Sequence, residues 1–362
     1  MWPDRRLIDL LGTDLPIIQA PMAGAMGTEL VIAAAEAGAL GSLPCAMVTP
    51  EKAREQVGII RQRTAKPLNL NFFCHTPVPA DAKAEARWRD RLTPYYKELG
   101  LDQNAPVTAA NRAPFDETMC GLVEATRPKV VSFHFGLPDE SLLKRVKAAG
   151  CVVLSSATTV AEAIWLEQHG ADAIIAQGAE AGGHRGMFLT DNVATQPGTF
   201  ALVPQVVDAV HVPVIASGGI SDGRGIAAAF MLGAAGVQIG TAYLKCPEAT
   251  IAPPFRAALA QAGADSTVVT NLMTGKPARG IANRLMRDIG PLSRETPAFP
   301  HAATAIGPLR AAAEKAGSGD FTPLWSGQAV ALAPTMPAAD LTRSLAASAL
   351  QRLRQIGAAA ST

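Results

Sequence analysis

The chain has 362 residues, of which 48% are hydrophobic and 17% are charged, so it carries enough apolar material for a large core and global disorder is excluded. Its 32 basic and 31 acidic side chains nearly cancel and aromatic residues make up only 5%, which argues against nucleic acid or an anionic membrane as the main partner. No apolar run reaches the length of a membrane span, and residues 1–6 lack the apolar stretch of a signal peptide. The five cysteines form no C-x-x-C pair, so we expect no disulfide framework and no metal site, and we predict a cytoplasmic protein.

Eight short apolar runs alternate along the chain, most of them with alanine-rich segments that look helical. Near-continuous apolar runs of this length are typical of parallel strands that are buried on both faces. We expect strands at residues 16–22, 39–45, 67–73, 130–136, 151–157, 173–178, 212–219 and 236–244. We expect helices at residues 29–37, 50–63, 116–126, 139–149, 159–169, 204–209 and 222–232. A doubly wound open sheet shows the same alternation, but the count of eight favours an α/β (β/α)8 TIM barrel.

Two stretches interrupt this rhythm. Residues 74–115 separate the third strand from its helix and include a helical pattern at 85–99. A loop of this length inside a compact domain is usually functional. Residues 246–322 follow the eighth strand, and we expect them to form a helical substrate domain, or lid, over the C-terminal ends of the strands.

The remaining chain is assigned to the barrel, which is predicted to comprise residues 1–245 and 323–362. Its last element is an amphipathic helix at 338–356, which is expected to close the barrel. Within the lid, helical patterns occur at residues 255–262 and 302–316.

Polar groups occur at the ends of several predicted strands, where the catalytic groups of such barrels lie. The first strand ends in Ala-Pro-Met at residues 20–22. The third carries Asn69 and Asn71, which face the same way because they are two residues apart. Asparagine is depleted in strands, so we expect both to form hydrogen bonds inside the barrel. The fourth strand carries His134, which fits either a satisfied core histidine or a catalytic group.

The most informative segment follows the sixth strand, where residues 177–186 read QGAEAGGHRG. A buried strand that runs into a glycine-rich loop is typical of the mouth of an active site. The glycines let the backbone approach a ligand and adopt positive φ. His184 is the side chain in this loop that titrates near neutral pH. An ordinary strand-to-helix turn, with a histidine that caps or packs, is the competing interpretation.

Two glycine turns end the seventh and eighth strands. Residues 216–220 read ASGGI and precede a helix, and residues 238–241 read QIGT. Backbone N–H groups in a glycine turn and at a helix N-terminus form an anion-binding site. Phosphate often binds at the loops after the seventh and eighth strands of such barrels. The two turns together therefore predict a phosphorylated ligand.

Taken together, these segments resemble the nitronate monooxygenases, formerly called 2-nitropropane dioxygenases, whose FMN lies at the mouth of a (β/α)8 barrel beneath a helical substrate domain. The resemblance extends from residues 19–22 to residues 325–328, and residues 71–75 and 132–136 resemble the class I branch. It implies that His184 faces the flavin and acts as a base on neutral nitroalkanes, and we take His134 as a second candidate catalytic residue. The expected FMN-binding residues are Ala20, Pro21, Met22, Asn71, Gln177, Gly182, Gly183, Ser217, Gly218, Gly219, Gln238, Gly240, Thr241, Trp325, Ser326 and Gln328.

The activity implied by the resemblance is oxidation of alkyl nitronates such as propionate 3-nitronate, and of neutral nitroalkanes, by O₂ to a carbonyl compound and nitrite. Some members place tyrosines in the lid, whereas this chain has only Tyr95, Tyr96 and Tyr243, none of them within 246–322. The preferred nitronate therefore stays open. FMN-dependent NAD(P)H reductases of the enoyl-acyl-carrier-protein or quinone type are an alternative on the same barrel. A non-catalytic flavin-binding protein is a second alternative, and either a monomer or a homodimer is expected.

Overall fold

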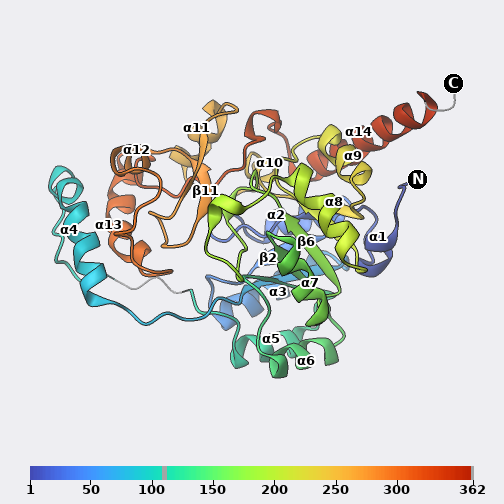
Figure 1. Ribbon diagram of the computed structural model, residues 1–362, viewed down its shortest axis with the longest axis horizontal. Helices are drawn as coiled ribbons and strands as arrows, with labels where there is room; N and C mark the ends of the chain where they lie inside the picture. The colour runs from blue at the N-terminus through green and yellow to red at the C-terminus, as the bar shows by residue number, and fades with distance from the viewer. Residues whose placement is uncertain (108–111, 360–362) are drawn as a thin grey trace.

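The computed structural model describes residues 1–107 and 112–359 and contains a barrel of eight parallel strands (Figure 1). Neighbouring strands follow the order β1-β9-β8-β6-β5-β4-β3-β2. The ring closes between β1 and the start of β2, because Leu40 donates its N–H to Ile17 O at 2.9 Å and accepts from Gln19 N–H at 3.0 Å. The strands are β1 (Ile17–Gln19), β2 (Gly41–Pro44), β3 (Leu68–Phe73), β4 (Val130–His134), β5 (Val152–Ala157), β6 (Ala173–Gln177), β8 (Val214–Ser217) and β9 (Gly236–Ile239).

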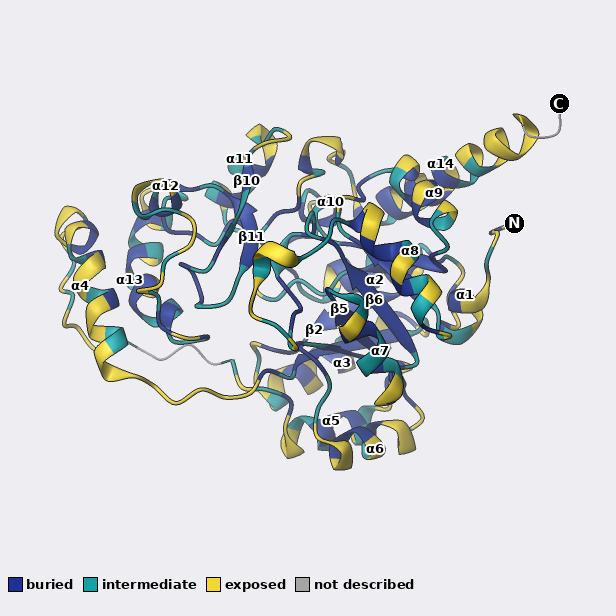
Figure 2. Cartoon of the chain, in the orientation of Figure 1, coloured by how far each residue is buried: buried dark blue, intermediate teal, exposed yellow. Residues whose placement is uncertain are grey.

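The predicted (β/α)8 barrel is therefore confirmed, and each predicted strand contains an observed one. The eighth prediction, 236–244, extends too far, because the short helix α10 (Thr241–Leu244) begins directly after β9. Figure 2 shows the strands buried and the outward faces of the surrounding helices exposed. The outer helices are α2 (Thr28–Glu36), α3 (Pro50–Arg63), α5 (Glu117–Thr126), α6 (Glu140–Ala148), α7 (Val160–Gln168), α8 (Thr199–Ala209), α9 (Gly223–Met231) and α14 (Ala338–Ala359).

Local signals start most of these helices. Thr49 accepts the Lys52 N–H ahead of Pro50 in α3, and Asp222 caps α9 in the same way. Helix α8 instead begins five residues before the predicted start at Pro204. Its first N–H, at Thr199, donates at 2.7 Å to the carboxylate of Glu180, so a cap from a distant loop sets its start.

The two ends of the chain complete the barrel. Helix α14 packs against α9 and α2, as expected for the closing helix. Helix α1 (Arg6–Leu11), which the sequence analysis did not predict, places Leu7 and Leu11 in a cluster with Ile18 and Ile215 of the strands. Gly236 leaves room for this helix, because a Cβ there would lie 2.3 Å from Leu7 Cδ2.

The segment after β9 is not purely helical, which corrects the prediction for 246–322. A three-stranded antiparallel sheet of order β10-β11-β7 joins it to the loop after β6. These strands have four or two residues each and depend on pairing between distant segments, so no local alternation reveals them. The elements are β7 (Gly183–His184), α11 (Pro253–Gln261), β10 (Thr267–Thr270), β11 (Ala278–Ile281), α12 (Arg284–Ile289) and α13 (Ala302–Lys315), with 3-10 helices at Val193–Thr195 and Val330–Leu332.

Helix α4 (Ala82–Glu98) lies beside α13, at one end of the molecule in Figure 1. It confirms the helical pattern predicted at 85–99 and packs into the lid rather than onto the barrel. Trp88 and Tyr96 of α4 are buried in a second core together with Leu309 and Phe321. The lid is thus assembled from two separate parts of the sequence. No helix in the described residues is long and apolar enough to cross a membrane.

Candidate active site

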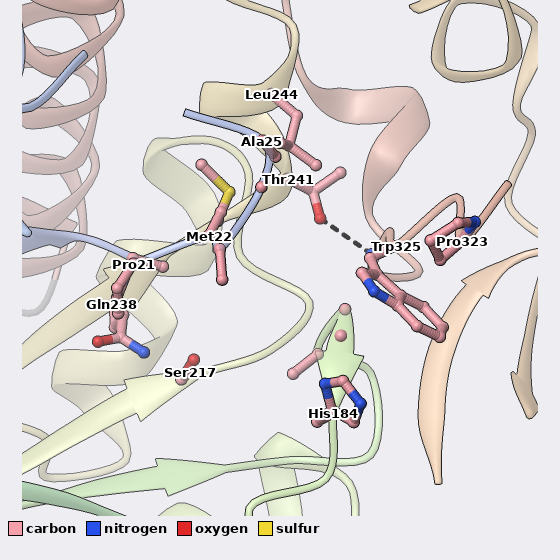
Figure 3. Close-up of a pocket in the computed structure, with 18 of the residues that line it drawn as sticks. Pro21, Met22, Ala25, His184, Ser217, Gln238, Thr241, Leu244, Pro323 and Trp325 are labelled. Carbon is pink, nitrogen blue, oxygen red and sulfur yellow. Dashed lines mark hydrogen bonds between the residues drawn. The ribbon is translucent and has the colours of Figure 1, made fainter. Parts of the chain in front are cut away.

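A cavity of about 240 Å³ lies between the C-terminal ends of the strands and the lid (Figure 3). The barrel supplies the loops after β1, β6, β8 and β9, and the lid supplies residues such as Phe255 and Arg310. Most of the predicted site residues line this cavity. They are Ala20, Pro21, Met22, Asn71, His134, Gln177, Gly182, Gly183, His184, Ser217, Gly218, Gly219, Gln238, Gly240, Thr241 and Trp325.

Ser326 and Gln328 do not line the cavity, and we remove them from the predicted cofactor site. Ser326 is fully buried, and its backbone packs so closely on Gly182 that a Cβ at Gly182 would lie 3.0 Å from Ser326 Cα. Gln328 is exposed, and its backbone N–H donates to Glu180 O at 3.0 Å. Both residues therefore hold the chain that returns from the lid against the loop after β6.

The two glycine turns present free backbone donors to the cavity. In the part of the chain that the structure describes, the N–H groups of Gly218, Gly219 and Gly240 have no hydrogen-bond acceptor. Gly218 has φ +118° and Gly219 has φ +70°, values that side chains disfavour. A Cβ at Gly218 would also lie 2.8 Å from Thr199 Oγ1. With the N-terminus of α9 following, these donors fit a phosphate group.

His184 lies opposite these turns, on the two-residue strand β7 beneath Trp325 (Figure 3). Its Nε2 is 2.9 Å from Thr274 Oγ1. The rings of Phe73, Phe135, Phe299 and Trp325 surround it, with centroids 5.5–6.2 Å away. This burial lowers the pKa of His184 well below its usual value, and nearby cations, Arg112 first among them, lower it further. The imidazole is therefore neutral near pH 7.

His134 also lines the cavity, but both of its ring nitrogens are occupied. Nε2 lies 3.2 Å from the His184 carbonyl oxygen, which can only accept, so Nε2 carries the proton. Nδ1 lies 3.1 Å from Ser156 Oγ and then accepts from that hydroxyl. Burial lowers the pKa of His134 to about 4. The geometry suits a residue that positions the backbone of His184 better than it suits a second base.

Gln177 and Arg185 hold the same loop. The Gln177 amide donates to His184 O at 2.9 Å and accepts from Gly186 N–H at 2.7 Å, so its polar atoms serve the loop although the residue lines the cavity. Arg185 is buried, and its guanidinium donates to backbone carbonyls of the loop between residues 178 and 183. The loop that carries His184 is therefore held by hydrogen bonds from two of its own side chains.

The hydrogen bonds expected for the two asparagines are confirmed. Asn71 Nδ2 donates to Ser132 Oγ at 2.9 Å, and Asn69 Nδ2 donates to the same oxygen at 2.9 Å and to Ser42 Oγ at 3.0 Å. Asn71 lines the cavity, whereas Asn69 lies deeper in the barrel. The hydrogen bonds of the two asparagines link β2, β3 and β4 at the barrel end of the cavity.

Sequence reasoning missed the cationic side of the cavity. Arg112, from the 74–115 stretch, lines it with its guanidinium carbon 5.6 Å from the centroid of Phe299. Its buried Nε has no acceptor within the described residues, and burial lowers its pKa to about 10. Arg310 of α13 lines the cavity too, and Lys276 Nζ lies 4.9 Å above the Phe135 ring. The length of the 74–115 stretch was the only signal in the sequence.

The tyrosines lie elsewhere. Tyr95 and Tyr96 belong to the lid through α4, although their residue numbers fall outside 246–322. Tyr95 donates to Asp288 Oδ2 at 3.2 Å and Tyr96 to Ala305 O at 2.6 Å. Neither lines the cavity, so neither is placed to contact a ligand there.

The fold and this cavity are those of a (β/α)8-barrel enzyme whose site lies between the strand ends and a lid. A sequence model of the nitronate monooxygenase family matches residues 4–348, and the chain belongs to that family, whose members are flavin-dependent. It is 41% identical over 354 residues to a nitronate monooxygenase of Paraburkholderia phytofirmans, with 97% of each chain covered. It is 42% identical over 344 residues to one of Pseudomonas aeruginosa, covering 94% of this chain and 97% of the relative.

Two solved structures share this fold over nearly the whole chain. A nitroalkane oxidase from Streptomyces ansochromogenes superimposes with a TM-score of 0.88 and 35% identity, covering 97% of this chain and 99% of that one. FabK from Thermotoga maritima superimposes with a TM-score of 0.74 and 27% identity, covering 99% of each chain.

Proposed function

We propose that the protein is an FMN-dependent nitronate monooxygenase. It oxidises alkyl nitronates such as propionate 3-nitronate, and neutral nitroalkanes, with O₂ to a carbonyl compound and nitrite. The observation that carries this proposal is a half-buried, neutral His184 in the same cavity as unpaired backbone donors on two strand ends. The family membership and the likeness to a nitroalkane oxidase support it.

The residues of the cavity fit FMN. The N–H groups of Gly218, Gly219 and Gly240 would hold the phosphate, and residues 20–22 and Asn71 would lie along the rest of the cofactor. When bound, FMN supplies the redox chemistry, taking electrons from the nitronate and delivering them to O₂. The protein's own part is to bind and orient both ligands and to manage one proton.

That proton belongs to the carbon next to the nitro group. In a neutral nitroalkane, the lone pair of His184 takes this proton, and the electron pair of the C–H bond shifts into the nitro group to give the nitronate. General-base catalysis of this kind contributes roughly 10²–10⁴-fold. A nitronate arrives without the proton, so it needs no base.

The cationic side of the cavity suits an anionic substrate. Arg112 lines the cavity on the lid side and Lys276 lies nearby, whereas Arg310, which also lines it, is paired with Glu314 at 2.8 Å. A nitronate is an anion, and propionate 3-nitronate carries a second negative charge on its carboxylate. Arg112, which forms no ion pair within residues 1–107 and 112–359 and whose Nε has no acceptor there, can bind such a group.

The test is His184→Asn, assayed on a nitroalkane and on its matching nitronate in preparations of equal FMN content. We expect the nitroalkane rate to fall by about 10²–10⁴-fold and the nitronate rate to change little. Equal losses on both substrates would mean that His184 orients the ligand instead. Flavin released by heat from the wild-type protein and identified as FMN checks the cofactor.

The likeness to FabK favours a second candidate, an FMN-dependent NAD(P)H reductase of the enoyl-acyl-carrier-protein or quinone type. Mixing the holoenzyme with NADH or NADPH without oxygen separates the two functions. Rapid bleaching of the flavin supports the reductase. A flavin that stays oxidised with both nucleotides but bleaches with a nitronate supports the monooxygenase.

A further inference from the structure

The pairing of two distant strands places a hydroxyl beside the candidate base. In the lid sheet, His184 of β7 is opposite Ala278 of β11. Arg185 N–H donates to Pro277 O at 2.9 Å and extends this pairing. The turn just before β11 therefore lies against the imidazole, with Thr274 Oγ1 2.9 Å from Nε2. Thr274 is 1% exposed and does not line the cavity, so it acts only through His184.

The second neighbour of the hydroxyl favours one direction of this hydrogen bond. Thr274 Oγ1 also lies 3.4 Å from the carbonyl oxygen of Lys276, which can only accept. The hydroxyl has a single proton, so when it donates to Lys276 O it must accept from His184 Nε2–H. The proton of the neutral ring is then on Nε2, and Nδ1 keeps its lone pair.

Nδ1 is the nitrogen that a substrate can reach. Within residues 1–107 and 112–359 it makes no hydrogen bond, and it is not among the enclosed side-chain atoms that lack a partner. Since His184 lines the cavity, Nδ1 is open to it.

We propose that Thr274 is a positioning residue, which accepts the Nε2 proton of His184 and holds the ring with the Nδ1 lone pair toward the substrate. The assignment rests on the proposed role of His184 as a base. It adds the group that selects the tautomer and the ring orientation.

The turn that carries Thr274 is rigid enough for this task. Gly275 has φ +93°, and a Cβ there would lie 2.3 Å from Pro297 O. Its N–H donates to Asn271 O at 2.8 Å, and the Asn271 amide donates to Ser293 O at 2.8 Å. The turn is thus closed by its own hydrogen bond and packs against the segment between α12 and α13, which keeps Thr274 in place relative to His184.

The first test is spectroscopic and needs no turnover. Nitrogen-15 NMR of the imidazole rings, with His184→Asn used to assign the signal, reports which nitrogen is protonated. We expect the wild-type holoenzyme to show Nε2–H and an unprotonated Nδ1 at His184. We expect Thr274→Val to shift the Nε2 signal and to mix the two tautomers. A wild-type ring protonated on Nδ1, or a His184 signal that Thr274→Val leaves unchanged, would overturn the proposal.

The second test compares substrates. Thr274→Val should reduce kcat/KM for a neutral nitroalkane by about tenfold, the effect of one hydrogen bond, while the nitronate changes by less than about twofold. Thr274→Ser should restore the nitroalkane rate. The control is Thr270→Val, which removes a buried hydroxyl that accepts the Leu272 N–H in the same lid and should leave the ratio of the two rates unchanged.

The outcomes separate this inference from the proposed function. A wild-type enzyme that oxidises neither substrate contradicts the monooxygenase, and the NMR experiment still decides the tautomer. An active wild type whose Thr274→Val variant loses both activities equally, or is not rescued by serine, overturns the role of Thr274 alone.

Discussion

The carbonyl oxygen of His184 is the point where the side chains of the site converge. It accepts from His134 Nε2 at 3.2 Å and from Gln177 Nε2 at 2.9 Å, while Thr274 holds the ring itself. The sequence analysis placed His134 and Gln177 against a ligand and did not assign Thr274. In the structure all three hold the imidazole of His184 or its backbone in position. Such preorganisation is what a base needs, since small errors in position are costly in rate.

Burial of this imidazole has a consequence for pH dependence. A pKa lowered below 6.5 keeps the base unprotonated as the pH falls through the range where an ordinary histidine would gain its proton. We expect kcat/KM for a neutral nitroalkane to stay constant as the pH falls through the usual histidine pKa of about 6.5. A pH profile of kcat/KM measures this. An acid limb with its midpoint at 6.5 or above would contradict the prediction.

Arg112 should select for substrates that carry a second negative charge. Arg112→Gln removes a guanidinium whose Nε is enclosed and has no acceptor among the described residues. A charge-assisted hydrogen bond contributes about 1.5–3 kcal/mol, so KM for propionate 3-nitronate should rise by roughly 10–100-fold. An uncharged alkyl group on the nitronate should make the effect smaller.

The control for this prediction is Arg87→Gln, on the exposed side of α4, which removes an equal charge from the lid surface. It should change neither the KM for propionate 3-nitronate nor the KM for a nitronate with an uncharged alkyl group. If Arg112→Gln raised both KM values equally, its charge would serve the nitronate group itself and not a second anion.

The site residues that could be predicted from the sequence lie in or directly after the barrel strands. Asn71 lies within a buried strand, and His184 and the glycine turns follow buried strands, so the barrel itself brings them together. Arg112 could not be found in this way, because a long excursion carries it back to the cavity. Gln177 was correctly placed at the cavity, but only the structure shows that its amide holds the loop.

At the scale of elements, hydrophobic runs were sufficient for the barrel and insufficient for the lid. Barrel strands are buried on both faces, so composition alone marks them. Strands β7, β10 and β11 are short, only β11 is buried along its whole length, and each strand forms only by pairing with segments distant in the sequence. The predicted start of α8 was wrong for the same reason, because the residue that caps the helix, Glu180, lies 19 residues before it in the sequence.

Helix packing around the barrel can be tested with two glycines. A Cβ at Gly223 of α9 would lie 2.4 Å from Ser348 Oγ and 2.5 Å from Ala349 N of α14. Gly223→Ala should therefore push α14 outward and destabilise the fold by about 1–3 kcal/mol. Thermal unfolding measures the change.

Gly58 in the middle of α3 provides the opposite case, because a Cβ there meets nothing within 4 Å. Gly58→Ala should stabilise the protein by about 0.5–1 kcal/mol, as alanine is the better helix former. A Gly223→Ala variant as stable as wild type would mean that α14 moves away from α9 without cost.

At the scale of the whole molecule, the cavity lies between two hydrophobic cores. The barrel core surrounds the strands, and a smaller core joins α4, α12, α13 and the segment near Phe321. The proposed phosphate donors belong to the barrel, whereas Thr274, Arg112 and Arg310 come from the lid side. We thus assign cofactor binding to the barrel and substrate recognition to the lid.

This division predicts that the lid can be loosened without loss of the cofactor. Trp88 is fully buried in the lid core, and its Nε1 donates to Ala302 O at 3.3 Å. Trp88→Ala should cost about 3–5 kcal/mol in that core. Hydrogen exchange should quicken in α4 and α13 and stay unchanged in the barrel strands, FMN should remain bound, and nitronate turnover should fall. Val146→Ala, in the barrel helix α6, is the control and should quicken exchange near α6 but not in the lid. Faster exchange throughout the barrel after Trp88→Ala would show instead that the two cores unfold as one unit.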